Sequence, residues 1–318
     1  MQNILITGGA GFIGSHLVES LIEKNKVYIL DDLSTGCFSN LNRMKNHRNF
    51  YFVKGSVLNL KKLASLVKKA DLIFHLAAGV GVKNILNNPL KTIRTNLQGT
   101  KNIIQLALPK KKKIVFASTS EVYGKSLQIP FDEEQSDRVL GPVQKLRWSY
   151  AQAKAMDESL LLAYYKQYNL PVVIIRFFNI VGSRQSSQYG MVLPSFIKQA
   201  QKNKLITVYG TGKQKRCFCD VGEAVEAIIL LSQNKQALGE IINLGNNKLI
   251  SINALAKKVK KILKSNSKIT HLPYKKVYGN DFDEIMVRQP DLKKIEKIIN
   301  WKPKISIQTI IKTIIKSI

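Results

Sequence analysis

The sequence is short of three features, and cysteine is the first of them. Only Cys37, Cys217 and Cys219 occur in 318 residues. They are too few for a disulfide framework, and their spacing does not match a zinc site. Because Cys217 and Cys219 alternate as strand residues do, we expect one buried face there. The sequence thus predicts a reduced, cytoplasmic protein without a metal ion.

The second shortage is of long apolar runs. No uninterrupted stretch is long enough to cross a bilayer. The opening residues, Met1-Gln2-Asn3, lead directly into an apolar segment and lack the pattern of a signal peptide. We therefore expect no membrane partner.

The third shortage is of acidic residues, with 21 Asp and Glu against 50 Lys and Arg and a net charge of +29. Such a charge suggests nucleic-acid binding. However, only nine of the basic residues are Arg, and phosphate readers favour Arg over Lys. The lysines are scattered apart from one run at 110–113. We therefore expect solvated lysine-rich faces, no nucleic-acid partner, and a positive field that helps to collect an anionic substrate.

A glycine-rich turn at residues 8–14 organises the rest of the chain. It follows the apolar run 3–7 and leads into the apolar-periodic segment 12–22, which predicts a strand, a tight turn and a helix. Glycine lets the backbone approach a pyrophosphate, and the helix N-terminus offers free N–H groups. The pattern therefore predicts a dinucleotide site whose residues include Gly8, Gly11, Phe12, Ile13 and Gly14.

Two further strand ends complete the predicted cofactor site. The apolar run 26–30 ends in Asp31 and Asp32. A carboxylate there accepts the adenosine ribose hydroxyls and repels a 2′-phosphate, which predicts NAD rather than NADP. The predicted strand 71–78 ends in mostly small residues that let the cofactor lie close, namely Leu76, Ala77 and Ala78. We expect His75 in that strand to be a packed residue rather than a catalyst.

Strands alternate with helices over the first half of the chain. The predicted strands are 3–7, 26–30, 50–53, 71–78, 113–117 and 171–177, and the predicted helices are 12–22, 60–67, 89–108 and 149–168. This rhythm is typical of right-handed βαβ units, so the predicted fold class is α/β with a doubly wound parallel sheet.

The pattern loosens after residue 178. Predicted helices at 192–201, 222–231, 253–263, 291–299 and 307–315 alternate irregularly with short strands at 206–209, 216–219 and 239–244. We expect a dinucleotide-binding domain at 1–178, to which the chain returns around 216–245. Residues 179–318 mainly form a smaller α/β substrate-binding cap over the carboxyl edge of the sheet.

Candidate catalytic groups follow the fifth strand and open the helix at 149–168. Tyr150 and Lys154 lie four residues apart and share one helix face. A tyrosine has a pKa near 10, but the Lys cation and a nicotinamide cation favour the phenolate, which makes Tyr150 a usable base. The hydroxyl of Thr119, at the end of the fifth strand, can orient the same substrate hydroxyl.

This set of motifs resembles the extended short-chain dehydrogenase/reductase family, which contains NAD-dependent nucleotide-sugar epimerases, dehydratases and decarboxylases. The matching segments are Gly8-x-x-Gly11-x-x-Gly14, Asp31, His75-Leu-Ala-Ala, Asn96, Thr119, Tyr150-x-x-x-Lys154 and Arg176-Phe-Phe-Asn179. The resemblance implies a Rossmann-type sheet, proton removal from sugar O4 by Tyr150, hydride transfer from C4 to NAD, and a 4-keto sugar.

The same resemblance implies further contacts. Lys154 binds the nicotinamide ribose, Asn96 belongs to the cofactor site, and Asn179 and Arg216 approach the diphosphate of a nucleotide-sugar substrate. It also implies a homodimer formed through the two long helices, near 90–108 and 150–168.

Finer motifs resemble UDP-glucuronate decarboxylases, including the decarboxylase domain of the bifunctional enzyme that makes aminoarabinose for lipid A. They are the segments 141–150 and 212–218, Arg288-x-Pro290-Asp291, and Trp301-x-Pro303. Thr119-Ser120-Glu121 matches that group, although GDP-mannose dehydratases carry the same triplet. A nucleotide-sugar 4-epimerase, a 4,6-dehydratase and a non-catalytic NAD-binding sensor stay open as alternatives, and Glu121 argues against simple epimerisation.

For decarboxylation, the expected catalytic set is Thr119, Ser120, Glu121, Tyr150 and Lys154. A ketone at C4 lies β to the C6 carboxylate, so CO₂ leaves once charge can flow into an enolate. Glu121 and Arg216 are candidates for positioning the carboxylate and delivering a proton to C5. Tyr209 is a candidate for stacking on the base, and Arg288 for the diphosphate or ribose.

Overall fold

A computed structural model of the chain describes residues 1–188, 190–279 and 282–317. Its centre is a seven-stranded parallel sheet with the strand order β11-β6-β5-β4-β1-β2-β3. The strands are β1 (Asn3–Thr7), β2 (Lys26–Asp31), β3 (Phe50–Lys54), β4 (Leu72–His75), β5 (Lys113–Thr119), β6 (Val172–Phe177) and β11 (Ile241–Leu244). The predicted α/β fold with a doubly wound parallel sheet is confirmed.

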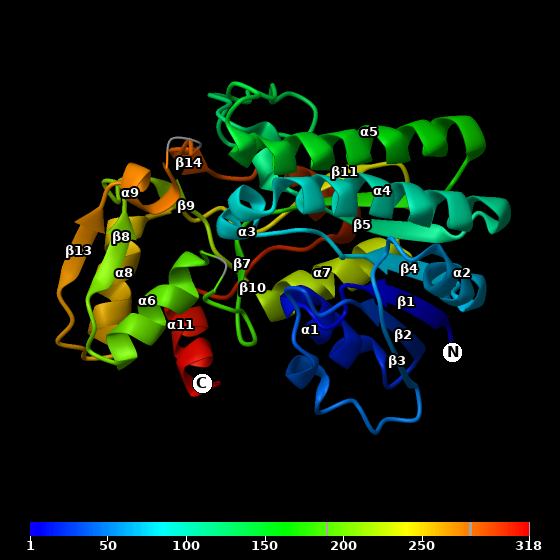
Figure 1. Ribbon diagram of the computed structural model, residues 1–318, viewed down its shortest axis with the longest axis horizontal. Helices are drawn as coiled ribbons and strands as arrows, with labels where there is room; N and C mark the ends of the chain where they lie inside the picture. The colour runs from blue at the N-terminus through cyan, green and yellow to red at the C-terminus, as the bar shows by residue number, and fades with distance from the viewer. Residues whose placement is uncertain (189, 280–281, 318) are drawn as a thin grey trace.

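Helices cover both faces of this sheet because each strand is apolar on both sides. In β1, Ile4 and Ile6 belong to one core and Leu5 to the other. The first core also contains α1 (Phe12–Leu21), α7 (Val221–Gln233) and α10 (Lys293–Ile299), and the second contains α2 (Leu60–Lys69), α4 (Pro89–Ala107) and α5 (Ser149–Tyr168). Figure 1 shows α4 and α5 side by side on one face, with α1 and α7 on the other.

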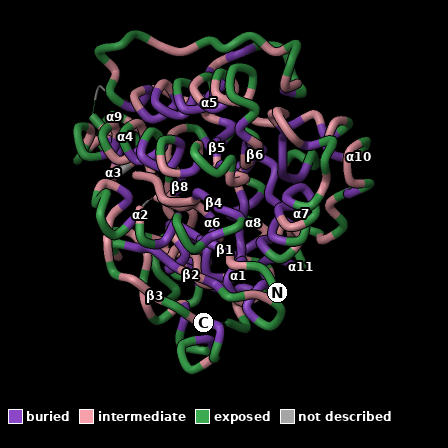
Figure 2. The backbone as a smooth tube through the Cα atoms, turned by 90° about the vertical axis from the view of Figure 1, so that its right-hand side faces the viewer, coloured by how far each residue is buried: buried purple, intermediate pink, exposed green. Residues whose placement is uncertain are grey.

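The second lobe lies beside the sheet, where Figure 1 shows the later elements gathered in green, yellow, orange and red. It is built from α6 (Val192–Gln201), β8 (Ile206–Tyr209), α8 (Ile252–Ile262), β13 (Ile269–Leu272), α9 (Tyr274–Tyr278) and α11 (Ile307–Lys316). Its helices are amphipathic: α8 buries Leu255 and Val259, and Ser251 caps its start by accepting from Ala254 N. Figure 2 shows buried backbone running through the interior and exposed backbone around the rim.

Two short sheets join the lobes. β7 (Ile180–Val181) pairs with β10 (Cys219–Asp220), while β9 (Lys215–Arg216) lies between β12 (Ile250–Ser251) and β14 (Val287–Arg288). The remaining elements are α3 (Val82–Asn87) and the 3₁₀ turns η1 (Phe38–Leu41), η2 (Leu108–Lys110), η3 (Ser120–Tyr123), η4 (Leu146–Trp148) and η5 (Lys235–Ala237).

The chain re-enters the first lobe through α7 and β11. In β11, Ile242 pairs with Ile175 of β6, so β11 is an edge strand of the large sheet. How far residues 1–178 and 179–318 behave as separate folding units stays a prediction.

The prediction of one strand at 216–219 is wrong. Arg216 belongs to β9 and Cys219 to β10, which lie in different small sheets. Cys217, Phe218 and Cys219 are all buried, so this segment is enclosed on both sides and has no solvent face. The strand predicted at 71–78 ends at His75, and the chain beyond it forms the wall of a cavity.

Candidate active site

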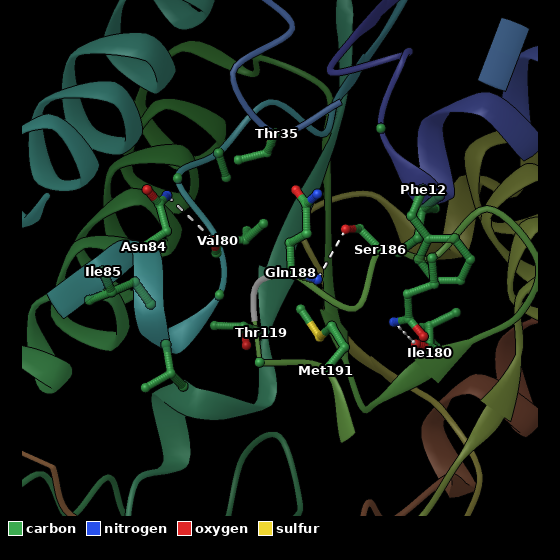
Figure 3. A pocket seen from close by; sticks show the side chains of 18 of the residues that line it. Phe12, Thr35, Val80, Asn84, Ile85, Thr119, Ile180, Ser186, Gln188 and Met191 are labelled. Carbon is green, nitrogen blue, oxygen red and sulfur yellow. Dashed lines mark hydrogen bonds between the residues drawn. The ribbon is translucent and has the colours of Figure 1, made fainter. Parts of the chain in front are cut away.

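A cavity of about 1200 Å³ lies between the two lobes. Its lining comes from the carboxyl ends of β1, β2, β4 and β5 and from the facing side of the second lobe. In the sheet, β2 and β3 lie on one side of β1, and β4 and the later strands lie on the other, so the strand order reverses at β1. Such a switch point is where doubly wound sheets bind ligands. Figure 3 shows Val80, Asn84 and Ile85 facing Gln188 and Met191 across this cavity.

The glycine turn forms a cradle that side chains would fill. Gly8 has φ +74°, and a Cβ there would lie 2.8 Å from the backbone nitrogen of Ala77. A Cβ on Gly14 would lie 2.2 Å from the carbonyl oxygen of Gly8. Gly11 is the N-cap of α1 and offers no side chain to cap the helix. The first turn of α1, which lines the cavity, therefore has N–H groups available for a ligand. These features fit a dinucleotide diphosphate.

Asp31, at the predicted ribose position, also stabilises the glycine turn. Its carboxylate accepts from Ala10 N at 2.9 Å and from Leu33 N at 2.8 Å, and it is 7% exposed. Burial raises the pKa of Asp31 above its ordinary value, although these two hydrogen bonds oppose the shift. Asp32 is exposed and accepts from Ser34 N. Both acids line the cavity, so they fit a dinucleotide ribose, but only Asp31 also holds the glycine turn.

The wall after β4 is formed by Leu76, Ala77 and Ala78, which all line the cavity. Asn96 lies behind it, 1% exposed, with its Oδ1 accepting from Gly79 N at 3.0 Å. Asn96 therefore supports the wall from behind. His75 is buried between hydroxyl partners, Thr7 and Thr100, as expected of a packed residue.

Tyr150 lines the cavity at the start of α5, while Lys154 lies beneath it. Tyr150 is 9% exposed. Burial and the negative charge of Glu121 raise the pKa of Tyr150, and the Thr119 hydroxyl opposes this in part. Lys154 is 2% exposed and donates to Ala117 O at 2.8 Å. Burial lowers the pKa of Lys154 to about 8, so in this environment Lys154 alone does not make Tyr150 a phenolate.

The η3 turn presents Ser120 and Glu121 to the cavity directly after β5. Thr119 caps the turn, accepting from Glu121 N at 3.2 Å. Glu121 forms two ion pairs, with Arg147 at 2.5 Å and with Arg288 at 2.6 Å. Burial opposes its ionisation, but the two guanidinium groups outweigh burial and lower the pKa of Glu121 to about 2. Glu121 is therefore an anion, and it is not a proton donor in this arrangement.

A third guanidinium group stands next to this pair. Arg216 is 6% exposed and binds Glu284 at 2.6 Å. Burial and the neighbouring Arg288 lower the pKa of Arg216 to about 10. We call Arg147, Arg216, Arg288, Glu121 and Glu284 the guanidinium cluster. Its cations outnumber its carboxylates by one, so this end of the cavity favours an anion.

The remaining predicted substrate residues also line the cavity. Asn179 has φ 40° and donates from Nδ2 to Cys217 O at 3.0 Å. Tyr209 packs edge-on against Tyr278, with ring centroids 5.7 Å apart. Arg288 binds Glu121, and its expected contact with a diphosphate or ribose stays a prediction.

Several lining residues escaped prediction. They are Arg147 and Glu284 of the guanidinium cluster, the aromatic residues Tyr274, Tyr278 and Phe282, and the residues 79–82, 84, 85 and 184–188. Arg147 could have been predicted from the sequence, because it lies three residues before Tyr150 in the motif at 141–150. The others lie far along the chain from the recognised motifs, and no local pattern marks them.

Within the described part of the chain, no group of His, Cys, Asp and Glu side chains is arranged to hold a metal ion. Over the same residues, no helix has the length and apolar character needed to cross a membrane.

Comparison with known proteins identifies relatives along nearly the whole length. The family model described as GDP-mannose 4,6-dehydratase matches residues 5–314. A UDP-N-acetyl-alpha-D-glucosaminuronate decarboxylase of Bacillus cytotoxicus is 43% identical over 96% of this chain and 94% of its own length. UDP-glucuronic acid decarboxylase 6 of Arabidopsis thaliana is 35% identical over 96% of this chain and 86% of its own. The crystal structure of dTDP-glucose 4,6-dehydratase from Bacillus anthracis in complex with NAD superposes with a TM-score of 0.87 at 26% identity, covering 100% of this chain and 96% of that one.

Proposed function

The chain belongs to the GDP-mannose 4,6-dehydratase family of NAD-dependent epimerases and dehydratases, and we propose that it decarboxylates a UDP-linked hexuronate with bound NAD. The observation that carries this proposal is the guanidinium cluster, which lines the same cavity as Tyr150. The excess positive charge of this cluster, at the end of the cavity that it lines, suits a sugar that carries a carboxylate. The names of both relatives support the same reaction and suggest glucuronate or its 2-acetamido analogue as the sugar.

The first chemical step is oxidation at C4. NAD, when bound along the glycine turn, supplies the acceptor for the C4 hydride. Tyr150 accepts the O4 proton as a phenolate, and the Thr119 hydroxyl orients that oxygen. Because burial raises the pKa of Tyr150, the phenolate needs positive charge beside it, and we assign that role to the ammonium of Lys154, which shares the helix face of Tyr150.

The second step breaks the C5–C6 bond: C6 leaves as CO₂, and the electron pair of that bond forms an enolate that spans C5, C4 and O4. A tight ion pair would hold those electrons on the carboxylate and slow the step. Arg147 and Arg288 are already engaged by Glu121. We therefore assign them to orienting the C6 carboxylate while Glu121 prevents full charge pairing.

Protonation of C5 gives a 4-keto pentose, which either leaves as such or takes back the hydride at C4 and the proton at O4. The charges in the cavity favour Arg216 over Glu121 as the donor to C5. The two ion pairs of Glu121 keep its pKa at about 2. The pKa of Arg216 is lowered to about 10, which brings this normally inert group closer to the range of a general acid. Glu121 then acts by placing the neighbouring guanidinium groups.

Incubation of the purified protein with NAD and a panel of UDP-sugars tests the proposal. UDP-glucuronate, UDP-N-acetylglucosaminuronate, UDP-glucose and UDP-galactose are followed by mass spectrometry. A mass loss from either uronate equal to CO₂, or to CO₂ and two hydrogens where the 4-keto product is released, supports the proposal and identifies the sugar. A mass loss equal to water, or an isomer of unchanged mass as the only product, overturns it in favour of dehydration or 4-epimerisation.

A pair of variants tests the role of the guanidinium cluster. Glu121→Gln should slow CO₂ release far more than it weakens substrate binding, because it frees Arg147 and Arg288 to pair tightly with the substrate carboxylate. Glu134→Gln is the matched control, since its side chain is 70% exposed. Equal rates for the two variants would remove Glu121 from the mechanism.

We also propose a cytoplasmic homodimer formed through α4 and α5. These helices lie side by side (Figure 1) and expose Leu90, Met156 and Tyr168. Light scattering during gel filtration distinguishes a dimer from a monomer.

A further inference from the structure

Asp157 is a buried acid that the proposed reaction does not use. It lies on α5, three residues after Lys154, and is 0% exposed. Among the described residues, neither of its carboxylate oxygens has a hydrogen-bond partner of good geometry, and the Thr100 hydroxyl is the one side-chain group close enough to lower its pKa by hydrogen bonding. Burial raises the pKa of Asp157 to about 6, so its anion needs a balancing positive charge nearby to be stable in the folded protein.

The only such charge that is not committed elsewhere in the described surroundings belongs to Lys154. Residues three apart on a helix lie on the same face, and the attraction between Lys154 and Asp157 acts on the pKa values of both groups. Lys154 has one hydrogen bond to a backbone carbonyl, and a carbonyl does not neutralise an ammonium.

The neighbouring acid Glu158 is already committed. It accepts from Arg176 Nε at 2.9 Å and Nη2 at 2.7 Å, and from Ser118 Oγ at 2.5 Å. The full charge of Arg176 is therefore balanced by Glu158. Asp157 is therefore the carboxylate with the larger effect on Lys154, and Glu158 raises the pKa of Lys154 less.

The other groups around Asp157 supply no competing cation. From β4, His75 is neutral because burial lowers its pKa to about 3. From α4, Thr100 offers only a hydroxyl. From η3, Glu121 is held by its own two guanidinium partners. Tyr150, on α5 itself, is an uncharged phenol until it gives up its proton.

We propose that Asp157 is a positioning residue that acts through Lys154: its negative charge keeps the Lys154 ammonium protonated beneath the catalytic tyrosine and thereby sets the pH range of the enzyme. The proposal rests on the assigned roles of Tyr150 and Lys154. Without Asp157, burial would drive the proton from Lys154. Removing a negative charge also weakens proton binding by Tyr150, so both groups would titrate at lower pH.

The direct test follows Lys154 itself in the enzyme without substrate. Nitrogen-15 NMR of lysine-labelled protein, assigned with Lys154→Met, should show one ammonium that titrates near pH 8, well below the others. In Asp157→Asn this titration should fall by about one unit or more, and in Asp157→Glu it should return toward the wild-type value. An unchanged Lys154 titration in Asp157→Asn overturns the proposal.

Activity provides the second readout. The pH optimum of Asp157→Asn should move to lower pH, with most of the loss on the alkaline side. A merely structural role would lower the rate by the same factor at every pH, which would also overturn the proposal. The NMR titration needs no substrate, so failure of the decarboxylase assignment and failure of this inference are distinguishable.

A substitution of Lys154 keeps the inference testable if Asp157→Asn does not fold. Lys154→Met leaves Asp157 without its cation, so the buried carboxylate must take up a proton in the folded protein. The melting temperature of Lys154→Met should then fall more steeply than that of the wild type between pH 5 and pH 8. Parallel pH profiles for the two proteins would contradict the coupling.

Discussion

Charge neutralisation at single residues decides which groups of this site can act as acids or bases. Glu121 stands at the end of β5, where its sequence position suggests a proton donor. Two guanidinium groups hold it as an anion instead. Tyr150 is in the opposite situation, because burial keeps it a phenol. Both effects come from neighbours that are distant in sequence or from burial.

Replacing Tyr150 by Phe removes the proposed base without changing the shape of the ring. Tyr150→Phe should fold, retain NAD and lose turnover by about a hundredfold or more. Its kcat is measured with the uronate substrate, and its melting temperature with and without NAD serves as the control for folding and cofactor binding. Retention of more than roughly a tenth of the wild-type rate, a barrier change under about 1.4 kcal/mol, would reject the assignment.

The adjacent acids Asp31 and Asp32 provide a matched pair for cofactor choice. Asp31→Asn should narrow the preference for NAD over NADP by about tenfold or more, because it removes a buried charge that repels a 2′-phosphate. Asp32→Asn, at an exposed position, should change the preference less. Titration calorimetry with both cofactors measures the ratio. An equally strong effect of Asp32→Asn would move the discriminating charge to that residue.

At the scale of elements, the open edge of the large sheet is closed by a loop. β11 is an edge strand, and its Asn243 N–H donates to Glu133 Oε1 at 2.7 Å. The Asn243 side chain also donates to Phe131 O at 2.9 Å and accepts from Tyr123 OH at 2.8 Å. Edge strands need such cover because their unpaired backbone groups invite pairing with other chains. The segment that follows η3 therefore protects the sheet.

Glu133 makes this cover sensitive to pH. Burial raises the pKa of Glu133 to about 7, above its value of about 4.3 in an unfolded chain. Ionisation therefore costs the folded state, and stability is lost as the pH rises through this window. Glu133→Gln keeps an acceptor for Asn243 and should raise the melting temperature at pH 8 but not at pH 4.

Differential scanning fluorimetry at these two pH values measures the effect. Glu134→Gln is the control, because that neighbouring side chain is 70% exposed. If Glu133→Gln and Glu134→Gln gave the same shift at both pH values, the burial of Glu133 would not be responsible.

At the scale of the whole molecule, the net charge of +29 is distributed unevenly. No acidic residue occurs at 159–219 or at 241–280, and these stretches supply most of the second lobe and much of the cavity lining. A nucleotide-linked uronate carries several negative charges. The lysine-rich lobe should therefore attract it over distances comparable with the Debye length.

Salt should weaken this attraction. Between about 0.01 M and 0.1 M ionic strength the Debye length falls from about 30 to 10 Å. The kcat/KM for the uronate should then fall by roughly tenfold, while kcat stays constant because it reports on the bound complex. Steady-state kinetics across a NaCl series measures both quantities. A flat kcat/KM, or a parallel loss of kcat, would contradict long-range steering.

Local patterns alone were enough to predict the glycine turn, the acids after β2 and the shared helix face of Tyr150 and Lys154. Each depends on residues close together in sequence, where strand and helix periods are visible. The same periods predicted α5 and α6 to the residue. They failed at 216–219, because no local pattern marks that β9 and β10 pair with strands of two different sheets.

Only the tertiary structure decided the charge state of the site. Arg288 reaches Glu121 across 167 residues of sequence, and Glu284 reaches Arg216 across 68. It also decided that Asp157, unremarkable in the sequence, is fully buried where its charge acts on Lys154. Such contacts leave no local period, because they form when separate elements pack together. Burial then shifts the pKa values through desolvation, which depends on all the surrounding chain rather than on neighbours in sequence.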